Sequence, residues 1–204
     1  MKLEIQEYRK DRTIYLNDEI DSSIVADIIC DIQDIIDNDY RIFEQNKQQL
    51  QALGDKYVKV YTETNEYPVI IININSPGGD IYSGLGLYDF IHNINTNTDH
   101  HISIICNGIV ASMATIILLA SDDRKATKHT SFLIHSLSDL TFGKMQDIED
   151  NLIECRRLNE MLSDIYLEHT KLTKTKLKEI DKSKKDWWFG VDKALELGLI
   201  KEII

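Results

Sequence analysis

Ser112 is the residue of this chain whose neighbours most directly suggest catalysis. It lies in the segment CNGIVASMATIILLA, between a glycine-led apolar run and a stretch that predicts a buried helix. Where a buried strand ends and a helix begins, unpaired backbone N–H groups and the positive helix end can stabilise an oxyanion that forms beside the hydroxyl. A lone serine is also common where elements pack closely. The partners of Ser112 therefore decide between a nucleophile and a small packing residue.

Three other segments offer the groups that a nucleophilic serine requires. Gly78-Gly79 follows a predicted strand and lets a substrate backbone approach closely, although Pro-Gly-Gly is usually a turn. His135 in FLIHSL is a candidate general base, and a core histidine bonded to a carbonyl is the alternative. Asp186 in KKDWWFG precedes two tryptophans that could shield an imidazole–carboxylate pair, and a capping role is the alternative. Asp181 is the next candidate for the acid.

Alternating strands and helices must bring these residues together. The β-branched run from Val69 to Ile74 is typical of a strand buried on both faces, and it ends at the glycine pair. HISIIC predicts a buried strand leading to Ser112, and SFLIHSL predicts another that ends near His135. YSGLGLYDFIHNI predicts a helix between them. The alternation predicts the α/β class with a mainly parallel sheet.

The N-terminal part predicts a strand, a helix and a polar section. DRTIYLNDEI favours a short strand, and SSIVADIICDIQDIID favours a helix with Ser22 or Ser23 as its cap. The polar section from about Asp39 to Tyr67 contains no repeat. Its three interpretations, in order of preference, are a helical extension, a hairpin around LGDKY and a partly mobile insertion.

One long amphipathic helix is predicted between Phe142 and Thr170. Its apolar positions recur at intervals of three or four residues with charges between them. This length exceeds the average of about three turns, so we expect the helix to meet a copy of itself rather than fold back on its own domain. The apolar positions are Ile148, Leu152, Cys155, Leu158, Leu162 and Ile165.

Composition limits the function classes. The 204 residues, 43% of them hydrophobic, suffice for one globular domain, and a net charge of −11 argues against nucleic acid and anionic membrane surfaces. Cys30, Cys106 and Cys155 are widely spaced among apolar residues, which predicts reduced core cysteines in the cytoplasm and no zinc site. No run is long enough to span a bilayer.

Five motifs together resemble the ClpP family, the proteolytic subunits of the Clp protease. INSPGG, GIVASMA, LIH, HT and KDWWFGVDKALELGLI occur in that family's order and approximate spacing, from about Arg12 to the C terminus. The resemblance implies a serine endopeptidase that works by acyl transfer. Ser112 would be its nucleophile, His135 its base and Asp186 the orienting acid, while the N–H groups of Gly79 and Met113 would form the oxyanion hole.

The resemblance also implies an architecture and partners. The fold would be a ClpP/crotonase-type spiral in a single domain, residues 1–204, with a handle helix from about Gly143 to His169. Handle helices would join two seven-membered rings around a chamber that admits unfolded polypeptides. No cofactor or metal is expected in this chain, since it lacks a phosphate-binding GxxxxGK[ST] loop, and ATP would be used by a partner unfoldase.

The sequence departs from the family in four places. Val110 and Thr115 replace small residues near the serine, which we expect to alter packing but not chemistry. Ser136-Leu137 replaces the common Gln-Pro after the histidine, in a segment that borders the substrate. The section from about 39 to 67 is interpreted as an insertion, and only about eleven residues precede the first strand, so a shortened axial loop is expected.

Other functions fit parts of the pattern. A crotonase-like acyl-CoA enzyme would not need a serine, a histidine and an aspartate in this order, and a signal-peptide-peptidase-like enzyme would need a membrane anchor. A non-catalytic ring scaffold would be indicated by loss of a triad member, whereas all three are present. A phage-type protease that matures capsids would share the whole site.

Overall fold

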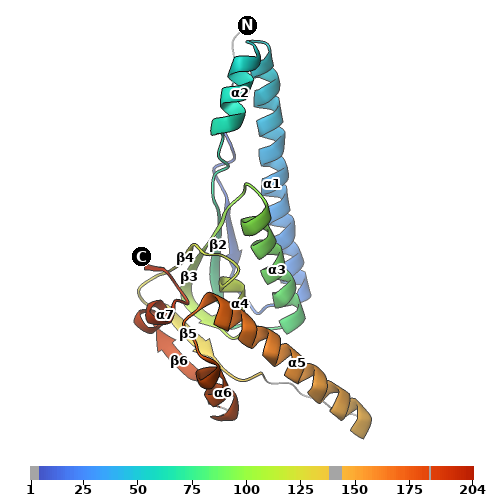
Figure 1. The fold of residues 1–204 in the computed structure, drawn as a ribbon, viewed down its shortest axis with the longest axis vertical. Helices are drawn as coiled ribbons and strands as arrows, with labels where there is room; N and C mark the ends of the chain where they lie inside the picture. The colour runs from blue at the N-terminus through green and yellow to red at the C-terminus, as the bar shows by residue number, and fades with distance from the viewer. Residues whose placement is uncertain (1–4, 138–143, 184) are drawn as a thin grey trace.

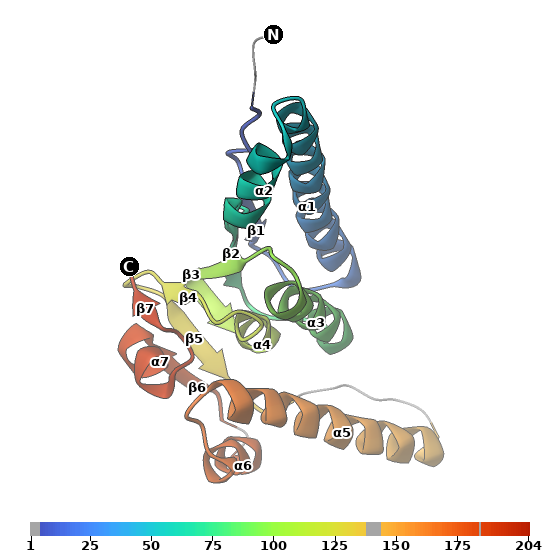
Figure 2. The same cartoon turned by 45° about the horizontal axis from the view of Figure 1, so that its top comes forward.

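A seven-stranded sheet forms the centre of the computed structural model, which describes residues 5–137, 144–183 and 185–204. Strands β1, β2, β3, β4 and β7 follow one another across the sheet, while β5 pairs with β3 and β6 (Figures 1 and 2). Every pairing is parallel except that of β5 with β6, so the predicted α/β class with a mainly parallel sheet is confirmed. The strands are β1 (Thr13–Leu16), β2 (Ile70–Ser76), β3 (Ile102–Ala111), β4 (Arg124–Ala126), β5 (Ser131–Ile134), β6 (Trp187–Gly190) and β7 (Glu202–Ile203).

Helices α1, α3 and α4 pack together beside the first three strands, and α5 projects away from the sheet (Figure 2). Their buried side chains join those of the strands in one hydrophobic core. The helices are α1 (Ser22–Gln51), α2 (Asp55–Thr64), α3 (Ile81–Asn97), α4 (Met113–Leu118), α5 (Met145–His169), α6 (Lys174–Ser183) and α7 (Val191–Leu197).

Strand β2 is buried on one face, not on both as its sequence predicts. Ile70, Ile72 and Ile74 are fully buried, whereas the alternate residues Ile71 and Asn73 are partly exposed. Successive side chains of a strand point to opposite faces, and in the single chain only one face receives the full helix layer. The β-branched residues from Val69 to Ile74, which Asn73 interrupts, therefore do not show how many faces of the strand are covered.

Helix α1 corrects two expectations and confirms a third. Its cap is Asp21, not Ser22 or Ser23, because the Asp21 carboxylate accepts a 2.8 Å hydrogen bond from the Ile24 N–H. Cys30 is exposed on this helix, so only Cys106 of the three cysteines is a fully buried core residue. The helix continues for 30 residues, and α2 then folds back beside it after a turn at Gly54 (Figure 1), so the polar section is a helical extension whose two helices form a hairpin at LGDKY.

A buried ion pair fixes the middle of α1 to the sheet. Both guanidinium N–H groups of Arg12 reach the Asp39 carboxylate, at 2.8 and 2.7 Å, and both side chains are almost completely inaccessible. Arg12 also donates to the backbone oxygens of Pro68 and Val69, just before β2. These bonds satisfy the buried charges and hold the start of two neighbouring strands against α1.

His100 completes this network as a neutral side chain. Its Nε2 atom lies 3.2 Å from Asp39 Oδ2, and its ring stacks on Tyr67 at 4.1 Å. Its Nδ1 atom is buried and has no hydrogen-bond partner among the described residues. Burial, partly opposed by Asp39, lowers the pKa of His100 below its ordinary value, because a proton on Nδ1 would find no acceptor.

We expect the free energy of unfolding to fall as the pH drops from 7 to 5. Below about pH 6.5 the unfolded chain protonates His100, whereas the folded chain resists protonation, so acid favours unfolding. Urea unfolding of wild type and His100→Gln at both pH values measures the effect, since glutamine keeps a donor for Asp39 but does not titrate. The wild type should lose more stability than the variant. Equal losses in the two proteins would contradict the assignment.

The long helix is confirmed from Met145 to His169, while Phe142 and Gly143 lie outside the described residues. Its predicted apolar stripe divides into two parts. Leu158 is buried, but Ile148 and Leu152 are 43% and 50% exposed, because the N-terminal half of α5 extends beyond the sheet (Figure 2). The exposed half leaves apolar side chains without a cover in the single chain.

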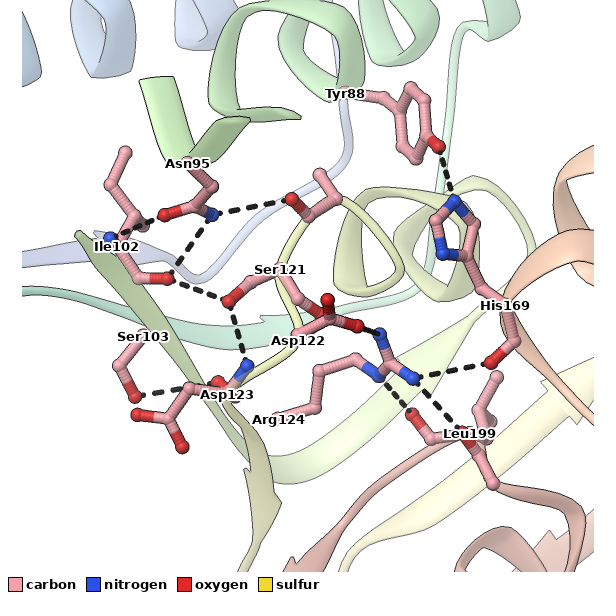
Figure 3. Close-up of polar contacts among 12 residues, drawn as sticks. Tyr88, Asn95, Ile102, Ser103, Ser121, Asp122, Asp123, Arg124, His169 and Leu199 are labelled. Atoms are coloured by element: carbon pink, nitrogen blue, oxygen red, sulfur yellow. Dashed lines mark hydrogen bonds and ion pairs between the residues drawn. The ribbon is translucent and has the colours of Figure 1, made fainter. Parts of the chain in front are cut away.

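Arg124 holds the other end of α5. Its side chain is completely buried and donates to backbone oxygens of His169 at 3.2 Å, Leu199 at 3.1 Å and Ser121 at 2.5 Å (Figure 3). The Tyr88 hydroxyl of α3 also lies 2.8 Å from His169 Nε2. The last turn of α5 is thus fixed to α3, to the loop after α4 and to the segment before β7.

Candidate active site

Ser112 lies in a strained turn between β3 and α4. Its φ and ψ angles are 54° and −125°, and among the described residues it is the only non-glycine with positive φ. Such a conformation costs about 1–3 kcal/mol and persists only where the surroundings hold it. The Ser112 N–H donates to the Leu133 oxygen at 2.9 Å, and the Ser112 oxygen accepts the Thr115 N–H at 3.0 Å. Hydrogen bonds at both the N–H and the carbonyl oxygen of Ser112 therefore hold the turn in place.

The glycine pair touches this turn because the ends of β2 and β3 are adjacent. Gly78 and Gly79 have φ of 99° and 151°, which side chains rarely tolerate. A Cβ atom on Gly78 would lie 2.7 Å from the Ser112 Cβ, and one on Gly79 would lie 2.2 Å from the Ile20 oxygen. Only glycine at both positions permits this packing.

Two backbone N–H groups remain unpaired beside Ser112. The parallel bridge to Ile20 uses the Gly78 oxygen at 2.8 Å and the Asp80 N–H at 2.7 Å, so the N–H of Gly79 between them takes no part. Met113 is the first residue of α4, where an N–H has no helical partner. Within the described part of the chain, neither N–H has an acceptor.

His135 and Asp186 lie at the same edge of the sheet as Ser112. Strand β5 is the neighbour of β3, with Ala111 paired to Leu133, so Ser112 and His135 both follow paired strand ends. Strand β6 runs antiparallel to β5, and its last pair joins Ile134 to Trp187. Continued by one residue, this register sets His135 opposite Asp186.

The structure does not join the three side chains. No hydrogen bond connects Ser112, His135 and Asp186, all of which are described residues. Such bonds are often long without substrate and tighten only in the complex. Ser112 and His135 line one cleft together with Asp181, whereas Asp186 is exposed and lies outside its lining.

The tryptophans do not shield Asp186 as expected. Trp187 points to the opposite face of β6, where it packs on Phe189 with ring centroids 4.8 Å apart. Trp188 shares the face of Asp186 by the alternation of the strand, but it is 52% exposed. Both acid candidates are thus open to solvent in the single chain.

The cleft at Ser112 has a volume of about 290 Å³ and borders two further hollows, one beside the N-terminal half of α5 and one between α5 and α6. A hollow of about 220 Å³ shares Gly79, Ile81 and Leu137 with it, and another of about 440 Å³ shares Asn159, Ser163 and Asp181 among other residues. Together they form a trough longer than one side chain. The lining of the central cleft is Glu19, Gly79, Ile81, Ser112, Met113, Ile116, Ile134, His135, Ser136, Leu137, Asn159, Leu162, Ser163, Tyr166, Leu177, Ile180 and Asp181.

Sequence reasoning missed Tyr166 and the hydroxyl of Thr115 as parts of this site. Tyr166 is four residues after Leu162 on the inner face of α5, so helical periodicity could have placed it near the core. The Thr115 Oγ1 atom donates to the Ser112 oxygen at 2.6 Å and is hydrogen-bonded to the Tyr166 hydroxyl. No local pattern predicts that contact, because the two residues are 51 positions apart.

Comparison with known proteins agrees with this fold. The family model described as Clp protease matches residues 44–204. The ATP-dependent Clp protease proteolytic subunit of Bacteroides thetaiotaomicron is 34% identical over 141 residues, which are 66% of this chain and 60% of that protein. Proteins of the same name from Deinococcus radiodurans and Porphyromonas gingivalis are 35% and 33% identical, covering 64% and 66% of this chain and 62% and 59% of their own lengths. The chain belongs to the Clp protease family.

The chain spans about 60% of the length of the curated relatives that it matches. Among its described residues, no helix combines the length and the apolar character that crossing a membrane requires.

Proposed function

We propose that this protein is a serine endopeptidase with Ser112 as its nucleophile. The observation that carries the proposal is the strained turn at Ser112, bordered by two unpaired N–H groups at the mouth of a cleft. A strained serine between two such donors is what acyl transfer requires, because the donors can receive the oxyanion without reorganising. Membership of the Clp protease family supports the same activity.

The reaction would proceed through an acyl-enzyme. His135 takes the proton of Ser112 as its oxygen attacks a peptide carbonyl, and the N–H groups of Gly79 and Met113 bind the resulting oxyanion. His135 then gives the proton to the leaving amine, and water releases the acyl group. Asp186 holds the imidazole in the correct tautomer and stabilises its charged form. Neither a cofactor nor a metal is required for these steps.

A polypeptide is the substrate class that fits the trough. One hollow adjoins the central cleft beside the N-terminal half of α5 and the other adjoins it between α5 and α6, so an extended chain can occupy positions before and after the bond that is cut. The lining of the central cleft combines apolar side chains, such as Ile116 and Leu162, with polar ones, such as Asn159. This shape supports cleavage within unfolded chains.

A fluorophosphonate probe tests the proposed activity directly. An activated serine reacts with the probe, whereas an ordinary packing serine does not. Assembled wild-type protein should be labelled on Ser112 and should cleave an unfolded protein such as casein. Complete inertness of the assembled protein would overturn the proposal and favour a non-catalytic ring scaffold. Cleavage confined to a capsid protein would indicate the phage-type protease.

We also propose that residues 1–204 form one domain that assembles into stacked rings through the handle helix. The exposed apolar side chains of the outer half of α5 support this, since Leu152 and Ile153 are 50% and 64% exposed. Rings would enclose the cleft in a chamber, and the expected number of subunits is seven for each ring. Cytoplasmic location fits three cysteines that form no disulfide.

Charge on the outer half of α5 is expected to split this assembly. Leu152→Asp places a carboxylate in the proposed contact, where desolvation without a partner is unfavourable. Sedimentation should show a large assembly for wild type and smaller pieces for the variant. The matched control is Gln146→Asp, which adds the same charge at an exposed polar position of the same helix. A stable wild-type monomer, or equal effects of both substitutions, would contradict the handle contact.

An ATP-driven unfoldase is the partner that we propose for folded substrates, with ATP bound by that partner. Helices α1 and α2 form the projecting hairpin from about 39 to 67, which we interpret as an insertion near a ring face. Residues before β1 pack against it, since Gln6 bonds to Asn46 and Tyr8 to Asn65. Because these residues pack on the hairpin, they do not form the long mobile loop that would meet an unfoldase at the ring axis. We therefore expect only weak stimulation by an ordinary Clp unfoldase.

A further inference from the structure

A chain of two hydrogen bonds leads from α5 to the backbone of Ser112. The Ser112 oxygen can only accept, so the hydroxyl of Thr115 donates its single proton to it, at 2.6 Å. The Thr115 oxygen then accepts from the Tyr166 hydroxyl. Both side chains are buried, Thr115 completely. The direction of donation is therefore fixed from Tyr166 through Thr115 to Ser112.

Tyr166 is suited to act as the first donor. Burial raises the pKa of Tyr166 to about 12, so the phenol keeps its proton at any working pH. Three residues later, α5 ends at His169, whose backbone oxygen accepts from the buried Arg124 and whose ring bonds to Tyr88 (Figure 3). Tyr166 thus projects from the anchored turn of α5, not from its exposed outer half.

The Ser112 oxygen and the Met113 N–H belong to the same peptide unit. This unit is trans and planar, so its C=O and N–H bonds point in opposite directions. A group that fixes the direction of the carbonyl therefore fixes the direction of the N–H. Thr115 holds this carbonyl with both its N–H and its hydroxyl, on the side opposite to the unpaired Met113 N–H.

We propose that Thr115 and Tyr166 are positioning residues that aim the Met113 N–H at the oxyanion and so link α5 to the active site. The inference rests on the proposed serine peptidase function and names what orients one of its donors. Neither residue touches the reacting atoms. Their effect is on the rate of the chemical step, because a preorganised donor acts on charge that develops only in the transition state.

An ordinary helical contact predicts a different behaviour. Threonine side chains often bond to a carbonyl three or four residues earlier, and such bonds alter local stability alone. If that were the whole role of Thr115, its loss would lower the melting temperature without a specific effect on kcat. The hydroxyl of Tyr166 would then be unimportant for catalysis.

Three single variants and one double variant separate these roles. Thr115→Val removes the hydroxyl but keeps the shape, Thr115→Ser keeps the hydroxyl, and Tyr166→Phe removes the first donor without touching the turn. With an apolar peptide substrate, we expect Thr115→Val to lower kcat by about tenfold, which is less than the loss of a whole oxyanion donor, with KM almost unchanged. Thr115→Ser should retain most of the rate.

Tyr166→Phe should also lower kcat, by a smaller factor. The double variant should be no slower than Thr115→Val, because both changes interrupt the same chain. A peptide boronate, which forms a tetrahedral adduct on serine, supplies a second readout. Its inhibition constant should rise by the same factor by which kcat/KM falls, as expected for a group that acts in the transition state. Sedimentation of each variant checks that assembly is retained.

The outcomes of these measurements separate the positioning role of Thr115 and Tyr166 from the peptidase function itself. An active wild type with unchanged kcat in both Thr115→Val and Tyr166→Phe would overturn this inference and leave the peptidase function intact. Equal losses in Thr115→Ser and Thr115→Val would overturn it as well, since the methyl group would then matter rather than the hydroxyl. A wild type that neither cleaves peptides nor reacts with a fluorophosphonate would overturn the peptidase function, and this inference with it.

Discussion

Ser112→Ala is expected to abolish peptide cleavage and fluorophosphonate labelling. Loss of a catalytic serine lowers kcat by about 10⁶-fold in well-studied serine proteases, because no other group can form the acyl-enzyme. Backbone hydrogen bonds to Leu133 and Thr115 already hold the turn that carries the Ser112 side chain, so replacing its hydroxyl by the methyl group of alanine should cause no rearrangement. The measurement is the initial rate of peptide cleavage together with mass spectrometry of the labelled protein.

Ser131→Ala is the matched control, since Ser131 is an exposed serine on β5 outside the cleft lining. It should react with the probe and cleave peptide at the wild-type rate. Sedimentation should show the same assembly for all three proteins. Cleavage by Ser112→Ala at more than a trace of the wild-type rate would mean that another residue is the nucleophile.

Asp186→Asn is expected to lower kcat by about 10⁴-fold, the loss known for the same change in a serine protease triad. An amide in place of the carboxylate stabilises the wrong imidazole tautomer and leaves the charged form of His135 without a partner. His135→Ala should lose a comparable share of activity, because members of a triad act as a unit. The rates of Asp186→Asn and His135→Ala are compared with that of the wild type under conditions in which each protein remains assembled.

Asp181→Asn decides which aspartate is the acid. Asp181 belongs to α6 and lines the cleft with Ser112 and His135, whereas Asp186 is placed opposite His135 only by the β5–β6 register. We expect Asp181→Asn to remain within a few fold of wild type. The reverse result, an active Asp186→Asn and an inactive Asp181→Asn, would move the role of the acid to α6.

Local features of the sequence were sufficient to predict the sheet class and the turn that carries Ser112. Alternating apolar segments specify strands and helices through their own periodicity, and positive φ at Gly78 and Gly79 is a requirement that few other residues meet. The long amphipathic pattern likewise predicted α5. Short elements with little periodicity were not predicted, including β4, β6, α6, α7 and β7.

No local sequence pattern could predict the contacts between segments that are far apart in the chain. The ion pair of Arg12 with Asp39 joins residues 27 positions apart, and the Tyr166 contact of Thr115 joins residues 51 positions apart. Likewise, Cys30 lies among apolar neighbours in the chain and yet is exposed, because helical rotation directs it away from the sheet.

The same division applies to the candidate site. Ser112 and Gly79 were identified from strand ends, since the backbone that activates a serine is encoded by adjacent residues. The placement of His135 opposite Asp186 depends on the antiparallel pairing of β5 with β6. Which strands pair with each other is determined by packing in the whole fold, not by the sequence of either strand alone. Periodicity reports which side chains share a face of one element, whereas the choice of neighbouring element is a property of the whole folded core.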